Sequence, residues 1–308
     1  MKPVQVLLMR FVSMNKNETR DRKCNMQMDK IITRNDIGVV GIVTAILLVG
    51  LVVTVFSLVQ TTYVPQWMDE IENDHMDTVF AQFTELKHTL DIQMYEPSSN
   101  SIPITTPLTL GSEDIPYFLS QKSSGKLEIL ENNMLIEIEG DSTESHQIGT
   151  IEYTSQNSYF TDQKHIYEAG SVILHQDQGT LLVSKPFLSL TNVDTINISF
   201  TVINITSING KTSAYGSHTC SILTNYSYSQ NYTLENITEI TISTSYQKPW
   251  KEYINSTLNN GGFIASEDYT LSQTSQDIIL NLESMPKTVH VLLTIITMNA
   301  QIAPGWIT

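Results

Sequence analysis

The sequence predicts an α+β protein: a long N-terminal transmembrane and amphipathic helix followed by a mainly antiparallel, β-sandwich-like ectodomain. Residues 37–59 carry no charge, residues 66–94 repeat apolar side chains every three or four positions, and later segments alternate apolar with polar residues. We therefore expect four parts: a cytoplasmic basic leader over 1–36, a transmembrane helix over 37–59, an amphipathic helical stalk over 60–95 and a β-rich extracellular domain over 96–308.

The composition allows a buried core and disfavours nucleic acid as a partner. Of the 308 residues, 41% are hydrophobic and 16% are charged, which argues against a wholly disordered chain. Residues 1–36 hold eight basic and four acidic residues, whereas residues 37–308 hold nine lysines and 28 acids. The second range has a net charge of −19, and such a surface repels phosphate backbones.

The uncharged stretch from Ile37 to Val59 has the length of a membrane span. As an α-helix its 23 residues extend about 35 Å, and a hydrocarbon core is about 30 Å thick. One alternative is the buried helix of a soluble protein, but such helices rarely stay uncharged for so long. Another is a cleaved secretory signal, whose apolar region is shorter and ends at small residues. Here Tyr63 and Trp67 follow instead, as in the aromatic belt of a membrane interface.

The charges around this stretch predict its orientation. Lys23, Lys30 and Arg34 precede it, and none of the 27 residues from Gln60 to Leu86 is basic. Because cytoplasmic flanks are enriched in Lys and Arg, the N-terminus should face the cytoplasm and residues 60–308 the outside. The expected location is the cell membrane, crossed once.

A second helix should continue from the first. Its apolar stripe consists of Met68, Ile71, His75, Val79, Phe83, Leu86 and Leu90. The acids Asp69, Glu70, Glu72, Asp74 and Asp77 mostly fall away from that stripe. Together with His75 they suggest either a cation site or, as we favour, a solvated face above the lipid headgroups. Pro65 either begins this helix or kinks a longer one.

The rest of the chain is predicted to form strands. Apolar Ile196, Ile198, Phe200 and Val202 alternate with polar residues, and the slip of phase at Ile203 suggests a bulge. Similar alternation occurs over 134–139 and 278–282. Residues 289–298 are apolar on both faces, as in a central strand or a strand between two layers. Residues 172–183 should form a hairpin, with Gly179 in a left-handed turn position. These strands predict a sandwich-like β domain.

Residues 197–257 are rich in acceptor sequons for N-glycosylation. Six are present, at Asn197, Asn204, Asn225, Asn231, Asn236 and Asn255. About a third of this window is Ser or Thr, so its seven asparagines would form roughly two sequons by chance. The excess predicts a glycosylated surface, and the alternative is a polar β surface with accidental sequons. Asn197 is the best candidate, because its side chain alternates away from its apolar neighbours.

No motif in the sequence predicts an enzyme. The chain has no Gly-rich phosphate loop, no G-x-S-x-G, no HExxH and no C-x-x-C pair. His165 and His175 lie in a probable strand region, where such a pair is more often solvated than bound to a metal. We therefore assign no catalytic, cofactor-binding or metal-binding residue.

Several stretches resemble the type IV pilin-like surface proteins of archaea. Arg34–Gly41 is similar to the junction between leader and helix in such pilins. The head resembles one set of uncharacterised members of that group over Gly149–Tyr153, Asn157–Gln163, Ile166–Leu174 and Ser245–Trp250. These stretches and the order of leader, uncharged helix, amphipathic helix and β-rich head carry the resemblance.

The resemblance implies a leader cut by a prepilin peptidase, with Arg34, Asn35 and Asp36 as the candidate cleavage positions. Translation starting at Met28 would give a leader of the usual short, basic kind, and the alternative is that the first 27 residues are a dispensable extension. The implied partners are the lipid bilayer, prepilin peptidase and other pilin-like subunits, contacted through the N-terminal helix. No cofactor is expected.

Two classes of function remain open from the sequence. One is a non-enzymatic, membrane-anchored surface protein, either a pilin-like subunit or an interaction module. The other is a solitary single-pass anchored ectodomain that acts as a ligand-binding receptor or an enzyme. The N-terminus of the native protein separates the pilin form, which is cut near residue 35, from a solitary anchored protein.

Overall fold

The computed structural model describes residues 36–95, 102–112, 123–208 and 211–304. The chain divides into two compact units, Met1–Leu58 and Val59–Thr308, and we call the second unit the head. In the first unit, helix α1 spans Asp36–Leu58, and every side chain from Val40 to Leu58 is exposed. Among the described residues, the helical stretch Val40–Tyr95 is the one long and apolar enough to cross a membrane.

A π-helical turn, η2 (Val59–Tyr63), separates α1 from helix α2 (Val64–Tyr95). Pro65 lies in the first turn of α2, has no N–H to donate to the carbonyl of Thr61, and needs room for its ring there. The wider π-helical turn directly before it supplies that room. Near Pro65 the chain therefore changes locally from an α-helix to a π-helical turn and back to an α-helix.

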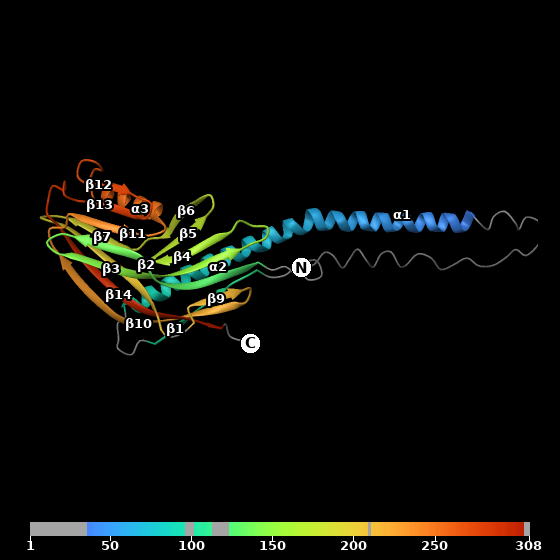
Figure 1. Cartoon of the computed structure of the whole chain (residues 1–308), viewed down its shortest axis with the longest axis horizontal. Helices are drawn as coiled ribbons and strands as arrows, with labels where there is room; N and C mark the ends of the chain where they lie inside the picture. The colour runs from blue at the N-terminus through green and yellow to red at the C-terminus, as the bar shows by residue number, and fades with distance from the viewer. Residues whose placement is uncertain (1–35, 96–101, 113–122, 209–210, 305–308) are drawn as a thin grey trace, which may run out of the picture. The chain divides into compact units, whose positions relative to one another are not determined.

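The head contains two β-sheets together with helix α2 and a third helix, α3 (Gln247–Asn260) (Figure 1). The five-stranded sheet has the order β1 (Ile104–Thr109), β10 (Thr219–Leu234), β14 (Val289–Pro304), β8 (Ile196–Ser207), β7 (Phe187–Asn192). The nine-stranded sheet has the order β12 (Thr270–Gln273), β13 (Asp277–Asn281), β11 (Glu239–Ser243), β2 (Ser124–Glu139), β3 (Thr143–Gln156), β4 (Gln163–Glu168), β5 (Ser171–Gln176), β6 (Gly179–Ser184), and β9 (Ser213–Gly216) also pairs with β2. Of the described neighbours, β14 and β8 run parallel and the others antiparallel. The expected α+β class is confirmed.

The two sheets touch at Gly149 of β3. A Cβ atom on Gly149 would lie 1.9 Å from the carbonyl oxygen of Ile205 in β8, so nothing larger than glycine fits. Strand β2 bulges at the same point, because its residues 131–133 lie opposite Gly149 without a paired position. The N–H of Gly149 instead donates to Oδ1 of Asn204 at 2.8 Å. A side chain of β8 thus supplies the partner that the bulge in β2 does not.

Two hydrophobic clusters lie on opposite faces of the strands that meet there. The α3 core gathers around Trp250 and Ile254 of α3, and the α2 core around Phe83 and Leu86 of α2. Strand β8 sends four side chains to the α3 core and then two to the α2 core, in the order Ile196, Ile198, Phe200, Val202, Ile203, Ile205. Strand β14 changes core at the paired position, between Ile295 and Ile296.

This arrangement explains the apolar patterns of both strands. The register of β8 against β14 is unbroken from Ile196 to Ser207, so the bulge predicted near Ile203 is wrong. The apolar pattern of β8 slips by one residue because Val202 enters the α3 core and Ile203, on the opposite face, enters the α2 core. Strand β14 is the third of the five strands in its sheet, so the prediction of a central strand is confirmed. Its apolar residues line the α3 core up to Ile295 and the α2 core from Ile296 onward.

The hairpin predicted over 172–183 is confirmed as β5 and β6, which pair around the turn Asp177-Gln178. Gly179 does not have a positive φ, so its predicted left-handed conformation is wrong. The left-handed pair is Ala169 (φ 51°) and Gly170 (φ 85°), which joins β4 to β5. Two such residues match the twist of a tight antiparallel hairpin.

We expect Gly149→Ala to destabilise the head strongly. Its methyl group would overlap the backbone of β8, and relieving such an overlap costs roughly 1–3 kcal/mol or more. Gly179→Ala is the matched control, because no atom lies within 4 Å of its Cβ position. Urea unfolding of the full chain in detergent micelles measures both, and equal midpoints for the two variants would show that the close approach is not required.

Candidate functional site

Helix α2 packs into the head along most of its length. Its predicted apolar stripe is buried, except for the half-buried Ile71, and it contacts β1, β4, β5 and β10. In Figure 1 the helix runs among these strands. The segment expected to form a stalk is thus part of the core of the head.

Glu72 joins α2 to the loop between β3 and β4. Its side chain is fully buried, and its carboxylate accepts backbone N–H bonds from Ser158 at 3.0 Å, Tyr159 at 2.8 Å and Phe160 at 2.7 Å. Successive backbone N–H groups that converge in this way form a nest for an anion. The expectation that Glu72 belongs to a solvated face is wrong, whereas the other four acids of that face are exposed. Its spacing of four from Met68 and four from Met76 is the sequence signal that places Glu72 on the buried face.

Two histidines are buried beside this joint. His75 of α2 donates from Nε2 to the carbonyl oxygen of Thr109 at 3.0 Å, and His165 of β4 donates from Nε2 to Oε1 of Gln163 at 3.2 Å. The ring of His165 lies 5.6 Å from that of Phe83. Burial lowers the pKa of His75 and lowers the pKa of His165 to about 4, so both rings are neutral at pH 7.

The expectation of a solvated histidine pair is therefore wrong for His165. Helix α2 covers this face of β4, which the strand pattern alone does not reveal. His175 is half-buried, and its Nδ1 lies 2.7 Å from Oγ1 of Thr180. The two histidines form no joint site.

A second buried carboxylate lies at the end of β4. Glu168 has no solvent exposure, and its Oε1 accepts the indole N–H of Trp250 at 2.6 Å and the hydroxyl of Thr244 at 2.8 Å. Thr244 also accepts the N–H of Tyr246 at 3.1 Å, which fixes the entry into α3. Burial raises the pKa of Glu168 to about 7, although the hydrogen bonds from Thr244 and Trp250 act in the opposite direction.

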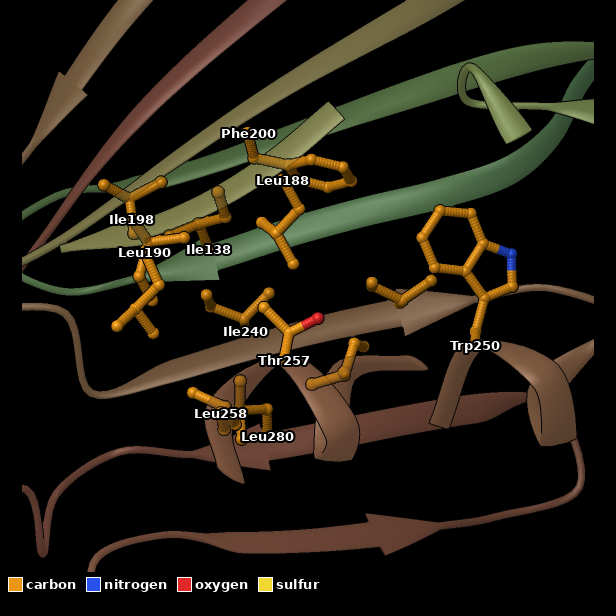
Figure 2. Close-up of a pocket in the computed structure, with 13 residues that line it drawn as sticks. Ile138, Leu188, Leu190, Ile198, Phe200, Ile240, Trp250, Thr257, Leu258 and Leu280 are labelled. Carbon is orange, nitrogen blue, oxygen red and sulfur yellow. The ribbon is translucent and has the colours of Figure 1, made fainter. Parts of the chain in front are cut away.

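An apolar cavity of about 40 Å³ lies beside α3 (Figure 2). Its thirteen lining residues include Leu188, Phe200 and Trp250, and all are hydrophobic except Thr257. Thr257 donates its hydroxyl to the carbonyl of Tyr253 at 2.9 Å. An engineered cavity that binds benzene has about 150 Å³, so this space is a gap in packing.

The predicted glycosylation positions fall into two groups. Asn197, Asn231 and Asn236 are exposed. The other three are half-buried: Asn204 accepts the N–H of Gly149, Asn255 accepts the hydroxyl of Tyr269 at 2.7 Å, and Oδ1 of Asn225 is buried. A glycan needs a side chain that reaches the solvent, so the fold favours the first three.

The remaining predicted positions concern the leader and metals. Arg34 and Asn35 lie outside the described residues, and Asp36 is the first residue of α1. Within the described ranges, no group of three or more His, Cys, Asp or Glu side chains is placed to hold a metal ion. His75 and the acids near it form no such group.

The fold defines a class: a β-rich two-sheet head that incorporates helices α2 and α3, preceded in the chain by a helix of membrane-spanning length. The family model described as "Family of unknown function (DUF7289)" matches residues 121–299, more than half of the chain, and the chain belongs to this family. The match covers most of the head and includes Gly149, Glu168 and Trp250. No curated protein and no solved structure matches the chain.

We expect Glu72→Ala to weaken the attachment of α2 to the head. The change leaves three N–H groups of the loop without their charged acceptor, at a cost of roughly 2–4 kcal/mol. Glu70→Ala is the matched control, because Glu70 is an exposed acid on the same helix and its loss should change the stability by less than about 0.5 kcal/mol. Urea unfolding of the full chain in micelles compares them, and similar midpoints would contradict the role of Glu72.

We expect Glu168→Gln to change the pH dependence of stability. Since the pKa of Glu168 rises from 4.5 to about 7 on folding, ionisation costs the folded state progressively more as the pH increases through that range. The stability of the variant relative to wild type should therefore rise by up to about 3 kcal/mol between pH 4.5 and pH 7 and then stay level. Thermal unfolding at a series of pH values measures this difference.

The control for this experiment is Glu139→Gln, which replaces an exposed acid on β2 and keeps Glu168. It should follow the wild-type profile. A constant difference between Glu168→Gln and wild type across the whole range would show that Glu168 does not titrate in this window.

Proposed function

We propose that the chain is a non-enzymatic, membrane-anchored surface protein that displays its head outside the cell, as a pilin-like subunit or an interaction module. One observation carries the proposal. Every side chain from Val40 to Leu58 is exposed, and nearly all of them are apolar. Such a helix is stable in lipid and not in water, because its apolar surface has no partner within the described part of the chain.

The charges support the orientation. Lys23, Lys30 and Arg34 precede the helix, and the following 27 residues contain no basic residue. Basic flanks are retained on the cytoplasmic side. Tyr63 and Trp67 are exposed in the turns after α1, with ring centroids 6.0 Å apart, and their amphipathic rings suit the outer interface.

The pilin-like form of the proposal depends on what happens to α1 after insertion. An apolar helix leaves the bilayer only when other helices replace the lipid around it. Gly41 and Gly50 have open space at their Cβ positions and would let a second helix approach closely. Cleavage near Arg34, Asn35 and Asp36 would remove charges that are costly to bury in such a bundle.

One experiment tests both the orientation of the head and the processing of the leader. Cells that express the protein natively are treated with an external protease, and the released and retained peptides are identified by mass spectrometry. We expect head peptides to be released, with glycans on at least one of Asn197, Asn231 and Asn236. The retained fraction should contain α1, and its N-terminus reports on processing.

Each outcome decides something. A head that the protease does not reach would overturn the proposed orientation. Sequons without glycans would contradict the prediction that the protein is glycosylated. A mature N-terminus near residue 35 supports the pilin-like form with prepilin peptidase as a partner. A retained leader beginning at Met1 would leave a solitary anchored ectodomain. Cells treated with protease after lysis are the control, because all sites are then accessible.

A further inference from the structure

The head carries an open polar pocket of about 490 Å³ on the nine-stranded sheet. Eleven residues line it, and none of them is charged. Five carry side-chain amides: Asn132, Asn133, Gln147, Gln247 and Gln276. Four more carry hydroxyl groups, and the remaining two are Met134 and Leu135. An uncharged wall is unusual on this head, because residues 37–308 carry a net charge of −19.

The pocket exists because β2 lacks a neighbouring strand there. On one side β11 ends at Ser243, opposite Leu135, and β9 begins to pair only at Glu128. Between these positions β2 bulges, and Asn132 has a left-handed backbone with φ 56°. The bulge interrupts the regular edge that a peptide strand would need for pairing.

The walls are fixed while several amides stay free. Nε2 of Gln247 donates to the carbonyl of Ser275 at 2.9 Å, and Nδ2 of Asn133 donates to the hydroxyl of Thr150 at 3.1 Å. Thr244 is bound to the buried Glu168. Asn132, Gln147 and Gln276 are exposed and make no side-chain hydrogen bond within the part of the chain that the structure describes. The fixed walls reduce the ordering that binding requires, and the free amides leave donors and acceptors available to a ligand.

We propose that this pocket binds a neutral saccharide. A side-chain amide both donates and accepts, as does a sugar hydroxyl, so the five amides match a ligand that presents many hydroxyl groups. No lining charge would attract an ion, and no aromatic ring would stack on a base. Leu135 offers an apolar surface for the C–H face of a sugar. The volume lies in the range of small-ligand sites, about 300–1,000 Å³.

The test uses the full chain in micelles of a detergent without a sugar headgroup. The neutral probes are maltotriose, cellotriose and tri-N-acetylchitotriose. The charged probe is trigalacturonate, and the peptide probe is a neutral Gly/Ser hexapeptide. Saturation-transfer NMR and titration measure binding. We expect at least one neutral trisaccharide to bind and the charged and peptide probes to bind much more weakly.

Two variants locate the site. Asn132→Gly keeps the left-handed backbone and removes one amide, and Gln276→Ala removes another. Each should weaken binding of the trisaccharide by about five- to tenfold, because each removes a hydrogen bond to it. Gln178→Ala, in the exposed turn between β5 and β6, is the matched control and should leave binding unchanged. Unfolding curves confirm that each variant is folded.

The proposal is overturned if no neutral trisaccharide binds at millimolar concentration, if trigalacturonate or the hexapeptide binds equally well, or if the pocket variants bind like the control. The pocket would act on either side of a membrane. Failure of this test therefore leaves the anchored-protein proposal standing, and failure of the topology experiment leaves the pocket standing.

Discussion

The head depends on one close approach, between the backbones of β3 at Gly149 and β8 at Ile205. Two sheets separated by side chains lie about 10 Å apart, so direct backbone contact requires a residue without a side chain. The contact also removes Gly149 from its ladder, and the N–H is satisfied by Asn204 from the other sheet. The close approach and the hydrogen bond together fix the position of one sheet against the other. That position determines where the α2 core and the α3 core lie.

Each core contains a helix and a buried carboxylate, and within the described residues neither carboxylate has a cation as its hydrogen-bond donor. Glu72 on α2 accepts three backbone N–H bonds, and Glu168 accepts hydrogen bonds from the indole of Trp250 and the hydroxyl of Thr244. Both bonds connect segments more than 75 residues apart in the chain. A buried carboxylate is stable only when its hydrogen-bond donors are in place. The two carboxylates therefore specify where α2 and α3 lie against the sheets.

The sequence predicted those features that depend on local pattern. The stripe of α2, the alternation in β2 and β8 and the hairpin of β5 and β6 all follow from spacing within a few residues. It missed features that depend on distant partners. Nothing near His165 shows that α2 will cover it, and nothing near Gly149 shows that β8 will cross it. A bulge was expected in β8 and one occurs in β2. The slip of the apolar pattern in β8 could come from a bulge or from a second core on the other face of the strand, and only the structure shows that the second core is the reason.

The buried histidines and the buried Glu168 act in opposite directions on stability. His165, with a pKa lowered to about 4, makes the fold less stable as the pH falls below 6.5, because the unfolded chain gains the proton first. Glu168, with a pKa raised to about 7, makes it less stable as the pH rises above 4.5. Both shifts have a similar size, so their effects offset each other over much of this range. Glu168 and His165 therefore offset each other, while His75, whose pKa burial also lowers, adds to the loss of stability as the pH falls below 6.5.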